Sequence, residues 1–359
     1  MDFSLRLKNA RGSLKKLNCD AFVVSHLTNV KYLTGFSGTS GMAIVSAEAA
    51  WFITDFRYQD QARAQVPSEY SVIIAKSGLW KEAAKLFKNK TTRVGFEAEH
   101  TSVAAFEELQ KQFAPIELVS TSHAIENLRL QKDDEELEIM RRAIQIADAT
   151  FDYICGVLRP GISEIEVSYE IENHMKSLGA SGTSFESIVA SGVRSSLPHG
   201  VASEKILQAG EMITIDMGAR YNGYCSDMTR TVCLGKPTSK QQKIYEIVWR
   251  AQRESASAFA PGVGCKAADK IARNVISEAG YKEFFGHGLG HGVGMDIHEQ
   301  PRVSPLGKGR LQVGNVVSCE PGIYLPDWGG VRIEDLILIT KSGGEILSKA
   351  PKPRKILAL

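Results

Sequence analysis

Two aspartates stand inside apolar, strand-like runs of the segment TIDMGARYNGYCSDMTR, residues 214–230. The Asn-Gly pair predicts a hairpin, and we place its tight turn on Tyr221 and Asn222. In that register Asp216 lies opposite Asp227. Directly opposed side chains have Cβ atoms about 4.5–5.5 Å apart, so two bare carboxylates would repel each other there. We therefore expect a group that neutralises them.

The same register gives this hairpin one polar face. It pairs Thr214 with Thr229, on the side that carries the aspartates. The opposite face is apolar and is lined by Ile213, Ile215 and Met217. A strand with one face directed at a site has this pattern.

A second pair of carboxylates, Glu320 and Glu334, is embedded in the apolar runs VVSCEPGIYL and GGVRIEDLILI. We expect these runs to be two strands joined by a turn that contains Gly329 and Gly330. Buried charges need charged partners or a metal ion. The second pair therefore poses the same chemical problem as the first.

Three histidines lie between the two carboxylate hairpins in the glycine-rich segment GHGLGHGVGMDIHEQ: His287, His291 and His298. Glycines allow backbone and imidazoles to crowd around one centre. Four carboxylates and one histidine form an oxygen-rich site that suits a pair of Mn²⁺, Co²⁺ or Zn²⁺ ions better than one thiolate-bound zinc. Two such ions, about 3.5–4 Å apart, can be bridged by carboxylates and by a hydroxide.

Each of these residues also has a simpler explanation. An embedded aspartate can cap a turn, a buried histidine can be a satisfied core group, and Glu334 with Asp335 can be the charge of an edge strand. Their joint occurrence favours a functional site over these structural explanations. Other catalytic motifs do not match: HEQPR lacks the second histidine of H-E-x-x-H, and G-x-G-x-x-G, G-x-S-x-G and Walker patterns are missing from the sequence.

The 359 residues, 43% of them hydrophobic, predict two domains with separate cores. Residues 1–125 alternate helical and strand patterns and predict an α/β domain. Its expected strands are the runs AFVVS, GMAIV, WFITD, YSVIIA and RVGFE. The acidic start and helical spacing of LRLQKDDEELEIMRRAIQIADATFDYI then predict a long helix, which opens a second domain at residues 126–359.

The second domain contains a faint internal repeat. The segments 159–179 and 260–280 match at a constant offset, and each has a Pro-Gly start and a terminal glycine. These signals begin and end a helix, so two unrelated helices could share them. A histidine and then a carboxylate pair follow each copy, with His199 after the first and His298 after the second. This order favours a true repeat.

Charge and cysteine content limit the possible surroundings. The formal net charge is +2, with no basic stripe, which argues against nucleic acid as a partner. The six cysteines form no C-x-x-C pair and are too sparse for a disulfide framework. The N-terminus does not resemble a signal peptide, and no run approaches the ~20 apolar residues of a membrane span. We expect a cytoplasmic protein.

Several motifs, in order, resemble one family. DMGARYNGYCSDMTRT, GHGLGHGVGMDIHE, EPGIY and GGVRIED are similar to the signatures of the metal-dependent Xaa-Pro peptidases, the prolidase and aminopeptidase P branch of the pita-bread (M24) family. KYLTGFSG and WFITDFRYQDQA resemble that branch's N-terminal domain. The resemblance implies an α/β domain of the creatinase/prolidase, RNase H-like type, followed by an α+β pita-bread catalytic domain with an internal pseudo-two-fold repeat.

By motif position, the resemblance implies two divalent ions per chain and five ligands for them: Asp216, Asp227, His291, Glu320 and Glu334. Asp227 and Glu334 would bridge both ions. Asp216 would hold one of them, and His291 and Glu320 the other.

The resemblance also implies roles around the metals. His199 and His298 would hydrogen-bond the substrate and the developing oxyanion, and Glu320 would shuttle a proton. The substrate site would be lined by His287, Tyr324 and Arg332. For Arg332, a structural ion pair with a ligand carboxylate is an equal alternative.

The implied reaction is hydrolysis of the Xaa-Pro peptide bond by a metal-bridging hydroxide. Dipeptidase (prolidase) activity is favoured slightly over aminopeptidase P activity, which releases the first residue of longer peptides with proline second. Creatinase lacks the metal ligands, methionyl aminopeptidase lacks such an N-terminal domain, and non-catalytic peptide-binding relatives have broken metal sets. The resemblance further implies a homodimer in which the N-terminal domain contributes to the partner's site.

Overall fold

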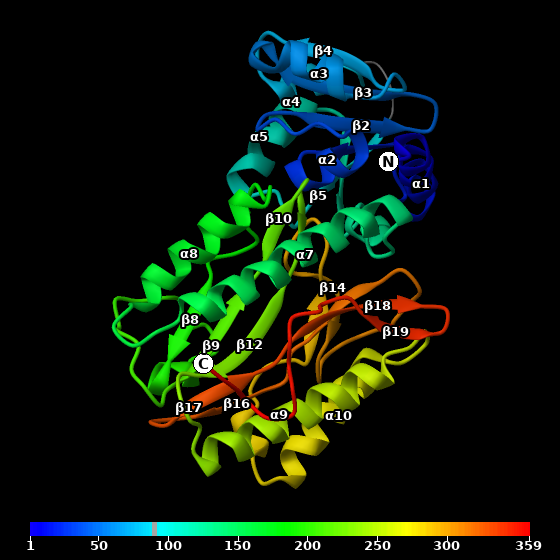
Figure 1. Cartoon of the computed structure of the whole chain (residues 1–359). Helices are drawn as coiled ribbons and strands as arrows, with labels where there is room; N and C mark the ends of the chain where they lie inside the picture. Colours follow the sequence, from blue (N-terminus) through cyan, green and yellow to red (C-terminus); the bar gives the residue numbers. More distant parts are fainter. Residues whose placement is uncertain (88–91) are drawn as a thin grey trace. The chain divides into compact units, whose positions relative to one another are not determined.

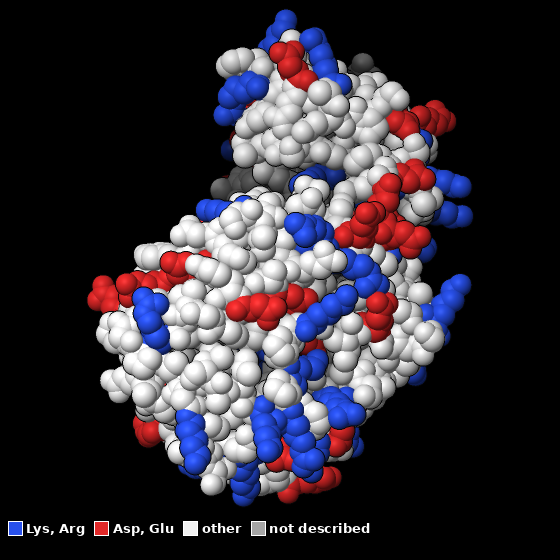
Figure 2. Space-filling view, viewed as in Figure 1, with Lys and Arg blue, Asp and Glu red and all other residues white. Residues whose placement is uncertain are grey.

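The computed structural model describes residues 1–87 and 92–359, which form two compact units, Met1–Arg129 and Leu130–Leu359 (Figure 1). On the face drawn in Figure 2, acidic side chains lie among basic ones. Across the described ranges, no helix combines the length and the apolar character that crossing a bilayer would need.

The first unit is built on a mixed six-stranded sheet with the order β4-β3-β2-β1-β5-β6. Its strands are β1 (Ala21–Val24), β2 (Met42–Ser46), β3 (Ala50–Asp55), β4 (Ser71–Ala75), β5 (Arg93–Glu97) and β6 (Glu117–Thr121). Its helices are α1 (Phe3–Leu17), α2 (Leu27–Thr34), α3 (Gln59–Gln65), α4 (Leu79–Lys85), α5 (Val103–Phe113) and α6 (Glu126–Arg129). The five strands predicted from the apolar runs are present, and β6 is a further strand that the sequence analysis did not identify.

The second unit consists of two similar halves. Its helices are α7 (Asp134–Val157), α8 (Glu164–Ser177), α9 (Ser239–Ala258) and α10 (Cys265–Glu278). The strands of the first half that matter for the site are β8 (Ile188–Ser191), β9 (Met212–Met217), β10 (Ala219–Tyr221), β11 (Tyr224–Cys225) and β12 (Met228–Cys233). Those of the second half are β13 (Gly290–Gly292), β14 (Glu299–Val303), β15 (Val316–Cys319), β16 (Gly322–Leu325), β17 (Gly329–Arg332), β18 (Asp335–Thr340) and β19 (Gly343–Ile346).

The internal repeat predicted from the sequence is confirmed at its helices. Both α8 and α10 have 14 residues, and they begin and end at the offset that the two sequence segments share. In Figure 1, α7 and α8 lie on one side of the strands of this unit and α9 and α10 on the other. The strands between the helix pairs can therefore present polar side chains to each other across the centre.

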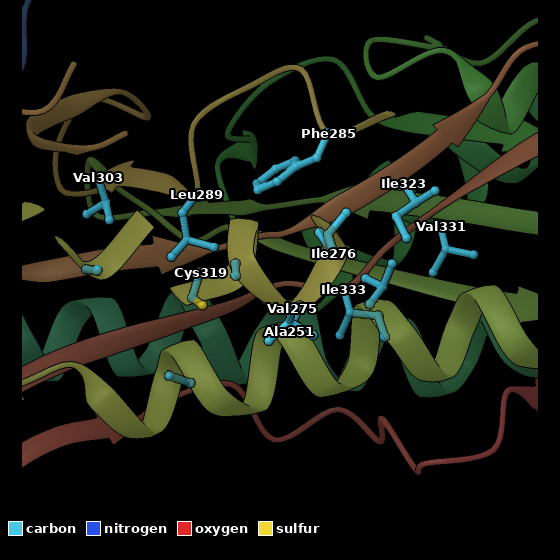
Figure 3. Close-up of a cluster of buried hydrophobic side chains, with 14 of the residues drawn as sticks. Ala251, Val275, Ile276, Phe285, Leu289, Val303, Cys319, Ile323, Val331 and Ile333 are labelled. Carbon is cyan, nitrogen blue, oxygen red and sulfur yellow. The ribbon is translucent and has the colours of Figure 1, made fainter. Parts of the chain in front are cut away.

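Each helix pair covers the apolar face of its own hairpin. Ile213, Ile215 and Met217 of β9 are buried in a cluster with residues of α7 and α8, which confirms the predicted apolar face. On the other side, residues of α9 and α10 such as Ala251 and Val275 are buried in one cluster with Cys319 of β15 and Ile337 of β18, part of which Figure 3 shows. This burial anchors the two hairpins, since it removes apolar area from water.

The turn of the first hairpin differs from the prediction. Its central residues are Asn222 and Gly223, which both have positive φ values, 48° and 91°. This is the conformation that an Asn-Gly pair favours in a two-residue hairpin loop, so the pair occupies the centre of the turn. The predicted centre at Tyr221 and Asn222 was wrong by one position.

As a result, Asp216 lies opposite Thr229 and not opposite Asp227. Thr214 lies opposite Thr231, so its predicted pairing with Thr229 was also wrong. The observed register differs from the predicted one by two residues, which is one full period of a strand. Side chains keep their face after such a shift, and both aspartates remain on the polar side.

The strand pairing of the second hairpin is interrupted at its two carboxylate residues. β15 pairs with β18, β16 pairs with β17, and Glu320 and Glu334 lie at the break between these two ladders. Their backbone N–H groups donate elsewhere, that of Glu320 to Leu289 O at 2.8 Å and that of Glu334 to Thr229 O at 3.0 Å. The second of these bonds ties one carboxylate hairpin to the other.

The predicted turn at Gly329 and Gly330 was wrong, because both residues belong to β17. The chain reverses between β16 and β17 at residues 326–328, where Asp327 has a φ of 59°. A Cβ at Gly330 would overlap the carbonyl group of Ser195. This glycine thus permits a close approach of two chain segments and does not form the turn.

Candidate active site

Three of the expected ligands come together in the centre of the second unit. Asp216 at the end of β9, Asp227 just before β12 and Glu334 just before β18 each offer a carboxylate oxygen, and these atoms lie within 4.8 Å of one another. The three residues are 9%, 5% and 1% exposed. Three acidic groups are thus buried in one place.

The other two expected ligands join this cluster. His291 Nε2 lies 3.3 Å from Glu320 Oε1 and 3.7 Å from Asp227 Oδ2. The structure therefore brings all five residues together, with His291 supplied by β13 and Glu320 by the position directly after β15. The resulting set has four carboxylates and one imidazole, which suits Mn²⁺, Co²⁺ or Zn²⁺.

The orientation of His291 fits metal ligation. Its Nδ1 lies 3.1 Å from Gly292 O. Because a carbonyl oxygen can only accept, Nδ1 must carry the proton of this bond, and in the neutral ring Nε2 has a lone pair. That lone pair is on the atom directed at the carboxylates. A hydrogen bond from the opposite ring nitrogen is the usual way in which proteins fix a ligating histidine.

Two buried carboxylate oxygens have no hydrogen-bond partner among the described residues: Asp216 Oδ1 and Glu334 Oε1. Burying an unpaired charged oxygen is costly unless a cation compensates it. The other oxygens of these groups are paired, since Asp216 Oδ2 accepts from Arg332 at 2.6 Å and Glu334 Oε2 accepts from Thr229 at 2.6 Å. One oxygen of each group is held by the protein and one remains available to a metal ion.

The pKa values show the same need for a cation. Burial, together with the charges of neighbouring carboxylates, raises the pKa of Asp227 and of Glu334 well above the ordinary values. Burial also raises the pKa of Glu320, but the hydrogen bond and the charge of His291 outweigh it and lower the value to about 2. Without a cation the cluster retains protons, and divalent ions would keep the carboxylates ionised.

Arg332 lies at the centre of the polar network beside the cluster and is 3% exposed. Besides Asp216, its guanidinium donates to Thr229 Oγ1 at 3.0 Å, Tyr324 OH at 2.9 Å and Pro198 O at 3.1 Å. The structure thus contains the ion pair with an expected ligand carboxylate that was one of the two interpretations of this arginine.

A chain of hydrogen bonds continues from Arg332 through Tyr324 to His287. Tyr324 OH lies 2.8 Å from His287 Nε2, and His287 Nδ1 lies 2.8 Å from Gly288 O. Because the carbonyl fixes the proton on Nδ1, Nε2 of the neutral ring accepts from Tyr324. Burial lowers the pKa of His287 and so favours this neutral form.

The two histidines with expected roles in catalysis are both exposed. The His298 ring lies edge to face with that of His291, with 4.4 Å between the centroids. Partial burial and the charge of His291 lower the pKa of His298, and the charge of His199 contributes in the same direction. His298 is thus next to the cluster, while His199 lies in the exposed segment between β8 and β9.

Sequence reasoning missed a supporting role for Ser318. The Ser318 hydroxyl donates to Glu320 Oε1 at 3.1 Å and accepts from the His291 backbone N–H at 3.0 Å. Strand alternation offered a signal, because a residue two positions before a ligand shares its face. Thr229, two positions after Asp227, holds Glu334 for the same reason.

A second group of potential ligands occurs in the first unit, formed by His26, His100 and Glu126. The two imidazole rings are stacked with an interplanar angle of 1° and centroids 3.7 Å apart. A metal ion lies near the plane of each ligating ring, and parallel stacked planes do not meet. The better candidate is therefore the cluster in the second unit.

Comparison with known proteins gives two family matches. The Creatinase/Prolidase N-terminal domain matches residues 6–131, and Metallopeptidase family M24 matches residues 138–341. The solved structure of an Xaa-Pro dipeptidase from Bacillus anthracis has a TM-score of 0.97 and 40% identity, covering 100% of both chains. That of an X-Pro aminopeptidase from Thermotoga maritima MSB8 has a TM-score of 0.89 and 34% identity, covering 97% of this chain and 99% of that one.

A curated relative, an Xaa-Pro dipeptidase of Pyrococcus horikoshii, is 38% identical over 341 residues, which are 94% of this chain and 95% of the relative. These likenesses extend through both units. They confirm the fold class and the family resemblance expected from the sequence motifs.

Proposed function

The chain belongs to metallopeptidase family M24, and from that premise we propose that it is an Xaa-Pro dipeptidase that works with two divalent metal ions. The observation that carries the proposal is the buried carboxylate cluster with two unpaired oxygens, in a chain 40% identical to an Xaa-Pro dipeptidase over its whole length. Peptide hydrolysis is the chemistry that this family and this cluster share.

The proposed metal ligands are Asp216, Asp227, His291, Glu320 and Glu334. When bound, divalent ions would polarise the carbonyl group of the scissile bond and make water acidic enough to act as a nucleophile at neutral pH. We propose Mn²⁺, Co²⁺ or Zn²⁺, since this mixture of oxygen and nitrogen ligands accepts each of them.

We propose that the protein's own groups handle the protons and the developing charge. Bound divalent ions would keep Glu320 ionised, so its carboxylate could accept the proton of the attacking water and pass it to the proline nitrogen as the bond breaks. His298 and His199 would donate hydrogen bonds to the carbonyl oxygen as it becomes an oxyanion. The lowered pKa of His298 leaves this ring neutral near pH 7, with one donor to offer.

Substrate binding is assigned to the hydrogen-bonded chain of His287, Tyr324 and Arg332. Arg332 already donates to four groups of the protein, so we propose that it holds Asp216 and Tyr324 in place and reaches the substrate mainly through Tyr324. Proline forms a tertiary amide with a fixed φ, and a rigid wall can select that shape.

We further propose the domain division, the assembly and the location of the enzyme. The two units are the N-terminal and catalytic domains, with the boundary near residues 125–131. The enzyme acts as a homodimer on Xaa-Pro dipeptides or on short peptides with proline second. It works in the cytoplasm.

Aminopeptidase P activity is the second candidate. It is favoured by the TM-score of 0.89 with the X-Pro aminopeptidase from Thermotoga maritima MSB8. The two activities differ in whether the site closes behind the proline carboxylate or leaves room for a longer peptide.

We expect metal-stripped enzyme to cleave an Xaa-Pro dipeptide, and not an Xaa-Pro-Xaa tripeptide, when Mn²⁺, Co²⁺ or Zn²⁺ is added back singly. Product release measured by chromatography distinguishes the candidates. Efficient cleavage of the tripeptide would establish aminopeptidase P instead. If no metal supports cleavage of either substrate, the proposed function is wrong, and a peptide-binding role or a different substrate takes its place.

For His298→Ala we expect kcat to fall by about 10²–10³-fold, the usual cost of losing an oxyanion donor. Bound metal, measured by elemental analysis, should stay near the wild-type content, because the ring contacts His291 without being one of the five proposed ligands. An equal loss of metal and activity would show that His298 is a ligand or supports one.

A further inference from the structure

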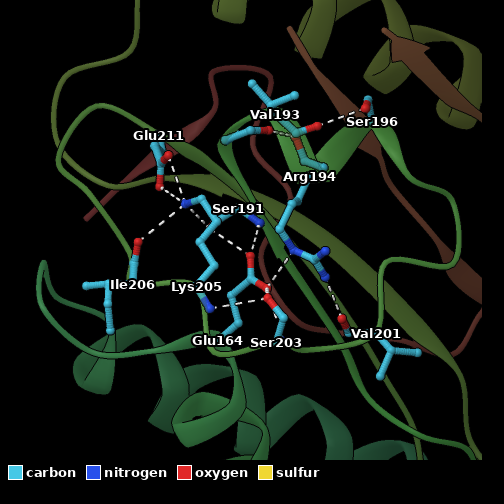
Figure 4. A network of polar contacts seen from close by, with 12 residues as sticks. Glu164, Ser191, Val193, Arg194, Ser196, Val201, Ser203, Lys205, Ile206 and Glu211 are labelled. Carbon is cyan, nitrogen blue, oxygen red and sulfur yellow. Dashed lines mark hydrogen bonds and ion pairs between the residues drawn. The ribbon is translucent and has the colours of Figure 1, made fainter. Parts of the chain in front are cut away.

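The Glu164 carboxylate, at the first position of α8, is completely buried outside the carboxylate cluster. Figure 4 shows that it collects donors from two separate parts of the chain. Oε1 accepts from the Ser191 backbone N–H and hydroxyl, both at 2.8 Å. Oε2 accepts from Arg194 Nε at 2.9 Å and from the Ser203 backbone N–H and hydroxyl at 3.2 Å and 2.6 Å. One side chain therefore receives five hydrogen bonds.

Ser191 and Ser203 flank one segment, residues 192–202, which carries His199. We call it the His199 segment. Glu164 thus closes this segment at its base, and Arg194 reinforces the closure by donating from Nη2 to Val201 O at 2.6 Å. Exposed segments are usually mobile, so a buried anchor at both ends limits the positions that His199 can take.

The middle of the His199 segment is attached to β17. The Gly330 N–H donates to Ser195 Oγ at 2.8 Å, and Arg332 Nη1 donates to Pro198 O at 3.1 Å. The second bond is on the residue next to His199, and it comes from the arginine that also holds Asp216. The base and the middle of the segment are thus fixed, and through Arg332 the segment is linked to Asp216 of the carboxylate cluster.

A similar arrangement occurs in the other half of the unit. Asp269 Oδ1 on α10 accepts from the Leu289 N–H at 3.0 Å and pairs with Arg273, which donates to the carbonyl oxygens of Phe285 and His287 at 2.9 Å and 2.8 Å. The second helix of each half therefore carries a buried carboxylate, paired with an arginine, that holds a histidine-bearing segment.

We propose that Glu164 is a positioning residue for His199: through Ser191, Arg194 and Ser203 it holds the His199 segment so that the imidazole faces the carboxylate cluster. A buried carboxylate is costly, and five donors with one arginine compensate it here. The result is a preorganised histidine, which is what oxyanion stabilisation requires. This inference rests on the proposed function, in which His199 donates to the oxyanion.

The first test is Glu164→Gln, which keeps the side chain's shape but directs an NH₂ group at protein donors. We expect backbone amides of the His199 segment to exchange with deuterium at least about 10-fold faster than in the wild type. The matched control is Glu136→Gln, another buried carboxylate in the first turn of a helix, 2% exposed, which should leave exchange in this segment unchanged. Unchanged exchange in Glu164→Gln would overturn the proposal whether or not the enzyme cleaves Xaa-Pro bonds.

The second test uses the reaction. Glu164→Gln should lower kcat by about 10–100-fold, as a displaced catalytic group does, with little change in KM or bound metal. In a His199→Ala background the same change should have almost no further effect, because the group that it positions is gone. Equal effects in both backgrounds would overturn the positioning role.

Two further results bear on the positioning role. If His199→Ala alone has wild-type kcat, the proposed role of His199 is wrong, and the positioning role is overturned with it. If Glu164→Gln does not fold, Ser203→Ala removes a single donor and should give a smaller change of the same kind in exchange and in kcat. No change in either quantity would contradict the proposal.

Discussion

Asp227→Asn is expected to lower turnover by about 10³-fold or more, since the loss of several kcal/mol of metal-dependent stabilisation corresponds to that factor. Asp227 is the proposed ligand that both comes within 4.8 Å of Asp216 and Glu334 and lies 3.7 Å from His291, so it connects the two parts of the cluster. An amide keeps the volume of the side chain but carries no charge for a metal ion. Activity with saturating Mn²⁺ and the metal content of the purified protein are the measurements.

The fold of this variant should persist. In the metal-free protein, burial and the charges of neighbouring carboxylates raise the pKa of Asp227, so its neutral replacement should leave the metal-free melting temperature unchanged or higher. Asp148→Asn serves as the control, because Asp148 accepts the backbone N–H groups of Lys349 and Ala350 and is not one of the five proposed ligands. Near wild-type activity of Asp227→Asn in excess metal would contradict the assignment.

The sequence was informative where the physical rule is local. The α8 and α10 helices begin and end where the repeated Pro-Gly and glycine signals place them, because these signals act within a few residues. The polar face of the first hairpin was also predictable, since alternation has a period of two residues. A register error of two positions left it intact, so Asp216 and Asp227 converge even though they are not opposite each other.

The predictions that were wrong depend on backbone conformation or on contacts between residues far apart in the sequence. The Asn-Gly pair signalled a turn, and the requirement for positive φ at both central positions, considered strictly, would have centred it on Asn222 and Gly223. Gly330 suggested a turn from its residue type, but its small size serves a close approach to Ser195, 135 residues away in the sequence. No local pattern contains such a contact.

The same limit applies to the groups that hold the site. Arg332 was assigned to the substrate site or to an ion pair from its motif position, and only the folded chain shows that it links Asp216, Tyr324 and Pro198. Glu164 has an ordinary place in a helix-start pattern, after Ser163 and before Glu166, which form the capping box. Its five hydrogen bonds depend on how β8 and residues 201–206 pack beside that helix, which the sequence of α8 does not reveal.

Removing the metal should abolish hydrolysis and also make the stability of the protein depend on pH. In the metal-free protein, the pKa values of Asp216, Asp227 and Glu334 are raised above those of the unfolded chain, chiefly by burial. The folded state then binds more protons than the unfolded state above about pH 4, so this contribution to the free energy of unfolding falls as pH rises through the folded-state pKa values. The raised pKa of His291 acts in the same direction.

Metal ions remove this loss of stability at higher pH, because they bind the ionised carboxylates and compete with protons. The increase in melting temperature on adding Mn²⁺ to stripped protein should therefore grow from about pH 5 to about pH 8. Wild type and Asp227→Asn share all other titrating groups. The difference between their increases in melting temperature therefore isolates the contribution of the cluster. An increase that is the same at every pH, or equally large in Asp227→Asn, would show that the metal binds elsewhere and that the buried carboxylates serve another purpose.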